Sequence, residues 1–309
     1  MTTRPTDTPY TTNKRTIMDG NSTSQASKRL ATFVAVLTLC AGLVGAQPSH
    51  AAGVWTNEPA GANVVLDCPF NSVGGCGILD VYSSSTIASD SSAPISPNSV
   101  VKSTMYAGNS SGGMQIGIAF PQTHREMYVG LMWRTNSQFE GRPQGNKLFF
   151  VRGSGVNGVF LFGADRLTNG SNSMIFNHNT GGLDNSHTCG SGGYMCYPNA
   201  GPGTLTVGVW TKLEAYVKSS TTATSRDGIV RWWVNGVLAG NYTNMNYGWN
   251  GLNDWTWSET WDGYVNPLPT VEWNHFIDHL HVSVGGGGAS TDQPPGPPAN
   301  PTIRSVTIP

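Results

Sequence analysis

Charged residues are scarce in this sequence, because only 11% of its 309 residues are Asp, Glu, Lys or Arg. Residues 1–51 hold five of the 17 Lys and Arg residues and two of the 18 Asp and Glu residues, so the rest of the chain has a net charge of about −4. Basic residues do not cluster beyond Lys28 and Arg29. A nucleic-acid partner is therefore not expected, because contact with a phosphate backbone requires clustered basic residues.

Long apolar runs are also lacking, with the exception of residues 30–46. This run has no charge, follows Lys28 and Arg29, and is followed by Ser49-His50-Ala51, which resembles an A-x-A cleavage site. The pattern is typical of a secretory signal peptide cleaved after Ala51. It is short for a membrane span. We therefore expect a secreted, extracellular protein that is not held in a membrane.

Cysteine is rare, with five residues in the chain. Cleavage of the signal peptide removes Cys40 and leaves four cysteines in an exported protein, which permit three disulfide pairings. The simplest pairing joins nearest neighbours, Cys68 with Cys76 and Cys189 with Cys196. A zinc site is the alternative, but the spacings do not match the usual finger patterns.

Helical periodicity is absent, and no amphipathic helix longer than two turns is evident. From Val64 onward, short apolar and β-branched segments alternate with turn clusters, and Asn235-Gly236 between two of them predicts a type I′ hairpin turn. Even spacing of this kind indicates an all-β sandwich or barrel. The predicted strands are 127–135, 146–153, 157–165, 172–179, 203–219, 228–236, 237–244 and 275–284.

Alternation along these strands predicts which side chains face the core. In 127–135, Val129, Leu131 and Trp133 share one face, and Arg134 lies on the other. In 210–218 the predicted inward residues are Thr211, Leu213, Ala215 and Val217, and the predicted outward residues are Trp210, Lys212, Glu214, Tyr216 and Lys218. A polar and aromatic outer face is what a polymer-binding groove requires.

The composition changes at Gly285, where the sequence becomes rich first in Gly and then in Pro. Stretches of this kind behave as linkers. We therefore predict a single domain over residues 54–284. It follows a signal peptide with a polar extension in residues 1–51 and precedes a linker with a truncated tail in residues 285–309.

Four segments carry a resemblance to a known family, and they are "GRPQGNKLFFVRG", "VWTKLEAYVKSSTTATSRDGIVRWWVNGVLAGNYTNMNY", "WSETWDG" and "HFIDHLHVSVGG". In order and spacing they resemble the concanavalin A-like lectin/glucanase jelly rolls of secreted bacterial proteins. The resemblance covers roughly residues 125–284 and is strongest to polysaccharide lyases of the heparin-lyase and glucuronan-lyase kind. It implies an all-β, two-sheet antiparallel jelly-roll sandwich. It does not imply a single activity, because laminin-G-like binding modules share the same stretch.

The resemblance also implies what a hydrolase of this fold would contain. Jelly-roll glucanases place closely spaced acidic residues on one strand, so that two carboxylates flank the scissile bond. Such a cluster is absent here, since Glu259 and Asp262 lie in a Trp-rich segment at an unsuitable spacing. A glycoside hydrolase is therefore disfavoured. Alginate-lyase motifs are incomplete as well, because Gly117 follows Gln115-Ile116 where a His is expected.

The wider lyase group remains the favoured interpretation, and a non-catalytic carbohydrate-binding module remains the alternative. β-Elimination on a uronic acid requires a cation that neutralises the carboxylate, a base for the C5 proton and an acid for the leaving oxygen. Arg134 or Lys147 is predicted to neutralise the carboxylate. The candidates for proton exchange are His178, His187, Tyr194 and Tyr197.

The predicted substrate contacts are Asn146 and an aromatic loop over residues 247–264, whose tryptophans are Trp249, Trp255, Trp257 and Trp261. Aromatic rings stack on sugar rings, so this loop is the predicted polysaccharide platform. The histidines His275, His279 and His281 are interpreted as packing and hydrogen-bonding residues and not as metal ligands. No Asp-rich calcium loop appears. We therefore expect no cofactor, leave a structural calcium ion open, and expect a monomer.

Overall fold

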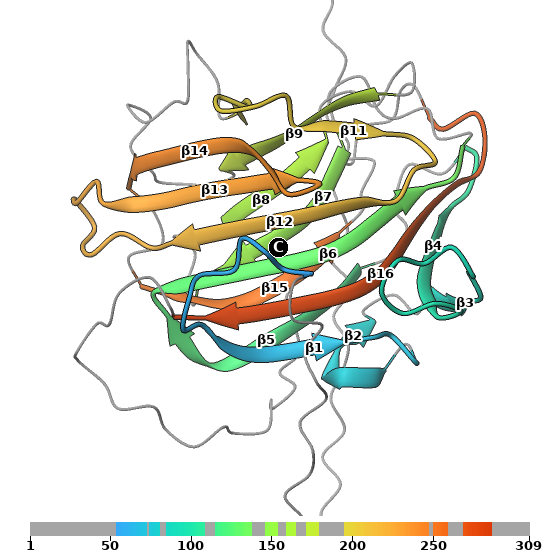
Figure 1. Cartoon of the computed structure of the whole chain (residues 1–309), viewed down its shortest axis with the longest axis horizontal. Coiled ribbons are helices and arrows are strands. Elements are labelled where there is room, and N and C mark those ends of the chain that lie inside the picture. The colour runs from blue at the N-terminus through green and yellow to red at the C-terminus, as the bar shows by residue number, and fades with distance from the viewer. Residues whose placement is uncertain are drawn as a thin grey trace, which may run out of the picture. The chain divides into compact units, whose positions relative to one another are not determined.

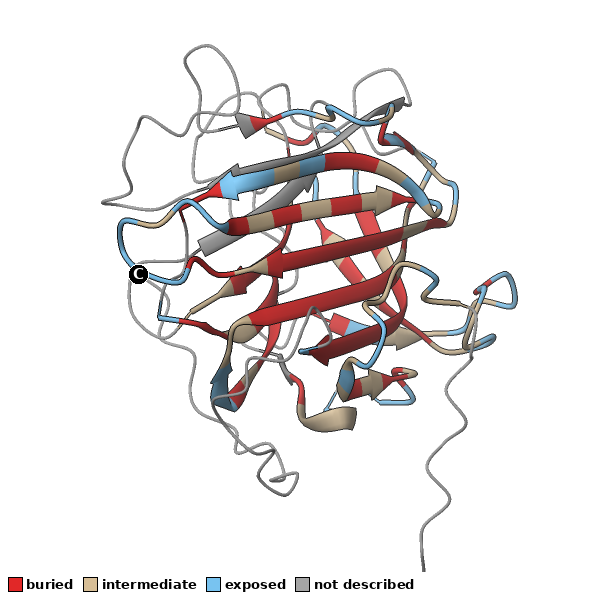
Figure 2. Ribbon diagram, turned by 60° about the vertical axis from the view of Figure 1, so that its left-hand side comes forward, coloured by how far each residue is buried: buried red, intermediate tan, exposed pale blue. Residues whose placement is uncertain are grey.

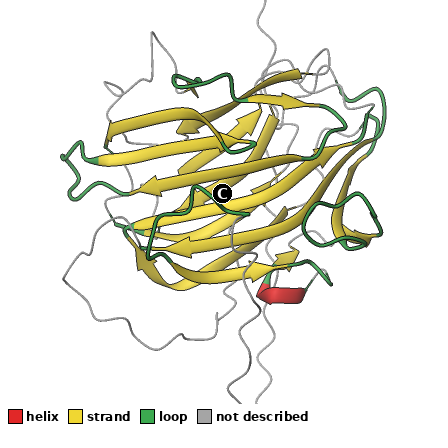
Figure 3. Cartoon of the chain, in the orientation of Figure 1, coloured by secondary structure: helices red, strands yellow, loops and turns green. Residues whose placement is uncertain are grey.

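The computed structural model describes residues 54–72, 74–80, 85–108, 115–137, 146–153, 159–164, 171–178, 195–246, 250–258 and 268–285. They all belong to one compact unit, Gln47–Pro309. The described residues are nearly all in strands and loops, with one 3-10 turn, η1 (Gly75–Gly77) (Figure 3). None of them forms a helix that could cross a bilayer.

Two antiparallel sheets make up the fold (Figure 1). Sheet A has the order β14-β13-β12-β6-β16-β4-β3, with β1 also paired to β16, and sheet B has the order β10-β9-β8-β7-β15-β5-β2, with β11 also paired to β9. The strands of sheet A are β1 (Asn63–Cys68), β3 (Ser85–Ala88), β4 (Val100–Met105), β6 (Glu126–Thr135), β12 (Thr211–Lys218), β13 (Gly228–Val234), β14 (Val237–Met245) and β16 (Trp273–Val284). The strands of sheet B are β2 (Leu79–Asp80), β5 (Gln115–His124), β7 (Asn146–Arg152), β8 (Val159–Ala164), β9 (Ser171–His178), β10 (Met195–Cys196), β11 (Thr204–Thr206) and β15 (Leu252–Ser258).

The core lies between the two sheets and is built by the predicted alternation. Val129, Leu131 and Trp133 of β6 are fully buried, and so are the inward residues of β12 (Figure 2). Sheet B contributes Phe149, Trp255 and Trp257 to the same cluster. Burial of each large apolar side chain contributes about 1.5–3 kcal/mol relative to exposure. The predicted two-sheet antiparallel jelly-roll sandwich is confirmed.

The predicted hairpin turn is also confirmed. Asn235 and Gly236 have φ angles of 51° and 80°, which are the positive values that a type I′ turn requires at both central positions. The Asn235 side chain accepts a hydrogen bond from the Lys212 backbone N–H at 2.9 Å. The turn therefore joins β13 to β14 and also ties the hairpin to β12.

The prediction of one strand over 203–219 is wrong. The segment forms two strands in different sheets, because β11 pairs with β9 in sheet B and β12 pairs with β6 in sheet A. Gly208 lies between them with a φ of 77°. This left-handed conformation is readily adopted by glycine and ends an extended strand. The turn lets the chain pass from one sheet to the other.

The disulfide predicted between Cys68 and Cys76 is present and joins the end of β1 to η1. Cys196 is also disulfide-bonded. Its predicted partner, Cys189, lies outside the described residues, so that pairing stays a prediction.

Replacing Cys68 and Cys76 together with Ala is expected to lower the free energy of unfolding by about 2–3 kcal/mol, because an eight-residue separation closes a short loop in the unfolded chain. Urea unfolding followed by intrinsic fluorescence measures the change. An unfolding midpoint equal to that of the unmodified protein would contradict it.

Candidate functional site

The face of sheet B that points away from the core carries polar residues on adjacent strands. Trp255 and Trp257 of β15 are in the core cluster, so alternation places Asp254, Thr256 and Ser258 on the opposite face. Thr256 pairs in register with Phe150 of β7 on one side and with Gly117 of β5 on the other. This outer face of sheet B is the candidate site.

An arginine and a carboxylate meet at the candidate site. Arg152 Nε of β7 lies 3.8 Å from Asp254 Oδ1 of β15, and the guanidinium lies over the Phe150 ring at 4.6 Å from its centroid. Thr256 Oγ1 donates a hydrogen bond to Asp254 Oδ1 at 2.9 Å. Burial raises the pKa of Asp254, although the charge of Arg152 and the hydrogen bond from Thr256 act in the opposite direction. A shielded carboxyl beside a cation is a frequent feature of functional sites.

Gly117 makes room for this arrangement. A Cβ atom at this position would lie 2.8 Å from Thr256 Oγ1. Any other residue would therefore push Thr256 away from its hydrogen bond to Asp254. The close approach of Thr256 leaves no room for a larger side chain at position 117 unless Thr256 shifts.

Two of the predicted catalytic residues lie in strands of sheet B, and a third directly follows one of its strands. Lys147 follows Asn146 at the start of β7 and pairs with Gly163 of β8. His178 ends β9 and pairs with Phe160. Tyr197 directly follows β10 and is 47% exposed. Their strands, β7, β9 and β10, are joined through β8 in one half of the sheet. His187 and Tyr194 lie outside the described residues.

The predicted substrate contact Asn146 is buried, with 6% of its surface exposed, and pairs with Ala164 at the first position of β7. It is therefore adjacent in sequence to Lys147. Its role in substrate contact stays a prediction.

Arg134, the other predicted cation, belongs to sheet A. Its Nη2 atom lies 2.6 Å from Asp90 Oδ2, and its guanidinium lies against the rings of Trp210 and Phe276. Burial favours the neutral acid, but the hydrogen bonds from Ser92 and the charge of Arg134 lower the pKa of Asp90. Arg134 is thus held in an ion pair on a different sheet from Lys147, His178 and Tyr197.

The predicted aromatic loop over 247–264 is corrected in its central part. Residues 252–258 form strand β15, which pairs with both β5 and β7. Trp255 and Trp257 are fully buried in the core and cannot stack on a sugar. Both tryptophans alternate with polar residues, which is the pattern of a half-buried strand. The high local content of tryptophan suggested an aromatic loop instead. Trp249 and Trp261 lie outside the described residues.

The outward face predicted for residues 210–218 is partly covered by another segment. Glu214 of β12 faces away from the core as predicted, yet it is fully buried. Asn57 donates to it from its side chain at 3.0 Å, and Tyr128 donates its hydroxyl at 2.6 Å. Residues that precede β1 therefore cover this part of the sheet, and sequence periodicity carries no signal for such a cover.

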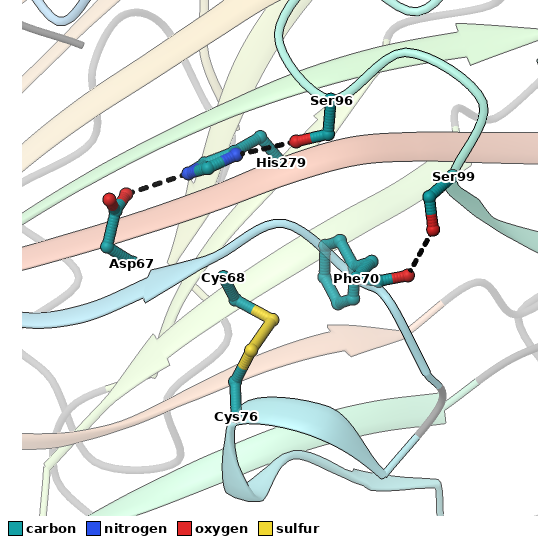
Figure 4. Close-up of a disulfide and its surroundings, with 7 residues drawn as sticks. All are labelled: Asp67, Cys68, Phe70, Cys76, Ser96, Ser99 and His279. Carbon is teal, nitrogen blue, oxygen red and sulfur yellow. Dashed lines mark hydrogen bonds and ion pairs between the residues drawn. A yellow bond between two sulfur atoms is a disulfide. The ribbon is translucent and has the colours of Figure 1, made fainter. Parts of the chain in front are cut away.

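A serine, a histidine and an aspartate form a chain of contacts beside the disulfide (Figure 4). Ser96 Oγ lies 3.0 Å from His279 Nδ1, and His279 Nε2 lies 2.7 Å from Asp67 Oδ1. Acyl transfer would also need free N–H groups for an oxyanion. The N–H groups of Ile95 and Ser96 donate to the Asp278 carboxylate at 2.6 and 2.8 Å, so the arrangement joins segments and does not form a nucleophile site.

The three histidines of β16 take part in packing and hydrogen bonding. Trp133 Nε1 donates to His275 Nδ1 at 3.0 Å, and complete burial lowers the pKa of His275 to about 3. His279 and His281 both contact Asp67. Within the part of the chain that the structure describes, no cluster of His, Cys, Asp or Glu side chains is arranged to hold a metal ion.

Sequence reasoning missed Arg152 and Asp254. Arg152 lies in the segment GRPQGNKLFFVRG, and Asp254 lies among the tryptophans that predicted a loop. The alternation of Asp254 and Thr256 with two tryptophans was the available signal for an outward polar strip on a strand.

Asp254→Asn is expected to change the pH dependence of stability. Folding raises the pKa of Asp254. The stability that its protonated carboxyl contributes is therefore fully present below about pH 4 and is lost as pH rises through the folded pKa. The stability of the unmodified protein relative to the variant should therefore fall over that range in urea unfolding. A difference that is constant with pH would show that Arg152 fully compensates the charge.

The chain matches no family model, and no curated protein is similar to it in sequence. Solved structures with a similar fold include three alginate lyases. Aly36B is 18% identical, with 74% of this chain and 93% of that chain covered and a TM-score of 0.50. vAL-1 from Chlorella virus is 14% identical, with coverage of 72% and 100% and a TM-score of 0.50. The marine PL-14 enzyme from Aplysia kurodai is 13% identical, with coverage of 72% and 100% and a TM-score of 0.52. At these identities the similarity shows the concanavalin A-like jelly-roll fold alone.

Proposed function

We propose that this protein is a secreted polysaccharide lyase that cleaves a uronate-containing glycan by β-elimination on the outer face of sheet B. The observation that carries the proposal is the gathering of cationic and proton-exchanging candidates on one sheet of a fold shared with alginate lyases. Lys147 and Arg152 belong to β7, and Asp254 to the neighbouring strand β15. Tyr197 directly follows β10, whereas His178 of β9 is in register with Phe160 and Val151, a position on the core face of the sheet.

The proposed reaction assigns a task to each kind of group. Lys147 or Arg152 binds the uronate carboxylate and disperses the negative charge that develops when the C5 proton leaves. A base removes that proton, the electron pair forms the C4–C5 double bond, and the C4–O bond breaks. The leaving oxygen receives a proton from an acid. Tyr197 and the residues His187 and Tyr194 are the candidates for these two proton transfers.

Arg152 supports the proposal better than Arg134 does. The nearest carboxylate of Arg134 is at 2.6 Å, whereas that of Arg152 is at 3.8 Å. A guanidinium with a loose internal partner retains donors for a substrate carboxylate, and its planar fork suits that group. The buried Asp254 then keeps Arg152 in place on the sheet.

A direct assay tests the proposal. The mature protein is incubated with alginate, glucuronan, heparin, hyaluronan and pectate, and the ultraviolet absorbance of the new C4–C5 double bond is followed. Absorbance should rise on one of these polymers. If none gives absorbance while one of them binds, the protein is a carbohydrate-binding module. If reducing ends form without absorbance, it is a hydrolase.

Secretion is part of the proposal, because the glycans concerned lie outside cells. The motif Ser49-His50-Ala51 supports cleavage after Ala51. N-terminal sequencing of the protein recovered from culture medium should give a chain that begins at Ala52. A protein found only in cell extracts with residues 30–46 intact would contradict this part.

A further inference from the structure

Residues 54–58, here called the strap, lie across the outer face of sheet A (Figure 1, the blue segment before β1). The Trp55 ring lies directly over Gly130 of β6, since a Cβ atom there would come within 2.4 Å of it. The same ring stacks on His281 of β16, with centroids 5.6 Å apart and planes inclined by 24°. The strap thus fills a site that only a glycine on β6 leaves open.

Polar contacts fix the strap to β12. Asn57 donates to the buried Glu214 carboxylate from both its side chain and its backbone N–H, at 3.0 and 3.3 Å. Lys212 Nζ donates to the Val54 carbonyl at 2.8 Å.

The last anchor of the strap is ionisable. His281 Nε2 lies 2.9 Å from Glu58 Oε1 of the strap, and His281 Nδ1 lies 3.2 Å from Asp67 Oδ1 of β1. Ionised carboxylates only accept hydrogen bonds, so the ring can satisfy both partners only when both nitrogens carry a proton. The geometry therefore requires an imidazolium, of which 2% of the side-chain surface is exposed.

We propose that His281 is a pH-sensitive latch, whose protonated ring closes the strap over sheet A and whose deprotonation releases it. Loss of the proton leaves one carboxylate facing a ring nitrogen that has no hydrogen. Two partly exposed carboxylates, Glu58 and Asp67, then flank a ring that no longer carries a positive charge. The strap, which carries Glu58, loses its ion pair to β16. Release exposes the surface around Gly130, Glu214 and Lys212.

The direction of the pH response follows from the neighbours of His281. Burial opposes its charge, but the hydrogen bonds to Asp67 and Glu58 outweigh burial and raise the pKa. The latch is therefore complete below about pH 6.5 and opens as pH rises through the folded pKa. For Asp67, burial is outweighed by the hydrogen bonds from His279 and His281, which lower the pKa. The contact between Asp67 and His281 therefore weakens only as pH falls below about 4.

Two further ionisable groups lie beside His281, and they are Tyr128 and His279. Tyr128 of β6 meets the ring edge-on at 6.2 Å. Burial and the neighbouring Glu214 raise the pKa of Tyr128, so its hydroxyl stays neutral. His279, on the same strand as His281, shares Asp67 as a partner, and its titration has to be followed by itself.

Hydrogen exchange combined with NMR tests the latch in the mature full-length protein. Protection factors of the strap amides, corrected for the intrinsic pH dependence of exchange, are measured from about pH 5 to pH 9, and the His281 and His279 rings are titrated in parallel. The protection factors of the strap amides should fall at least about tenfold as pH rises, as expected for loss of a hydrogen bond to a charged group. The pH midpoint of this fall should equal the titration midpoint of the His281 ring. Protection in β6 and β12 should stay constant. Strap protection that is flat, or that follows His279, overturns the proposal.

Two variants separate the latch from general stability. Glu58→Gln removes one carboxylate at a partly exposed position and should lower the His281 pKa and the strap midpoint by the same amount. His281→Gln cannot titrate and should abolish the transition. The matched control, Glu272→Gln, changes an exposed glutamate just before β16 and should leave both midpoints unchanged. If His281→Gln does not fold, Glu58→Gln decides, and a strap midpoint that stays in place while the His281 pKa moves refutes the latch.

Discussion

Arg152→Ala is expected to lower kcat/KM on the cleaved polymer by roughly 10²–10³-fold, which is typical for removal of one group that stabilises developing negative charge. In the proposed reaction the guanidinium faces the uronate carboxylate, whose charge rises as the C5 proton leaves. Arg152 also packs over Phe150 at 4.6 Å, so part of the loss could arise from a displaced ring. Arg152→Lys keeps the charge and the aliphatic stem, and it should recover part of the activity.

Matched arginines on the other sheet serve as controls. Arg231 of β13 is partly exposed, and its Nε atom donates to Asn241 at 2.8 Å. Arg231→Ala should leave kcat/KM within about twofold, because surface substitutions of this kind have small effects. Arg134→Ala breaks the ion pair with Asp90 and should lower stability without a comparable loss of activity. Full activity in Arg152→Ala together with loss in Arg134→Ala would move the site to sheet A.

Trp255→Ala is expected to lower the free energy of unfolding by about 3–5 kcal/mol, the usual cost of removing a large aromatic side chain from a core. The side chain is fully buried between the sheets and packs near Phe149, with ring centroids 6.5 Å apart. Urea unfolding measures the loss. Polysaccharide binding per folded molecule should be unchanged, because this ring does not reach the surface.

Trp255→Phe is the matched control for this prediction. The indole Nε1 of Trp255 has no hydrogen-bond partner in the described part of the structure. Replacement by Phe removes an unsatisfied buried donor while it keeps most of the apolar volume, so it should cost much less than the Ala variant. Unchanged stability in Trp255→Ala combined with lost polysaccharide binding would restore the aromatic platform that the sequence suggested.

Much of the fold was predictable because its signals are local. The strands 127–135, 146–153 and 228–236 were placed within one or two residues of β6, β7 and β13. Their period-2 pattern reflects the pleat of each strand on its own. The strands before residue 125 were not predicted individually, and the change of sheet at Gly208 was missed. The apolar pattern of a segment does not indicate which strand it will pair with.

The candidate site was less predictable, since its residues come from distant parts of the chain. Lys147 was identified from the resemblance, and the structure places it on the sheet that also carries His178 and Tyr197. Arg152 and Asp254 become neighbours only because β15 pairs with β7. A carboxylate that is far along the sequence from its cation carries no local pattern that marks the pair.

The sequence by itself determined the all-β class, the inward faces of β6 and β12, the Asn235-Gly236 turn and the first disulfide, because each depends on residues a few positions apart. Only the tertiary structure decided which polar residues on the outer faces of the sheets are covered. Glu58 and His281 are 223 residues apart in sequence and 2.9 Å apart in space, and Trp55 reaches Gly130 from outside the sheet. Alternation assigns a side chain to one of two faces of a strand, but what lies against that face is fixed by long-range pairing and by segments from distant parts of the chain.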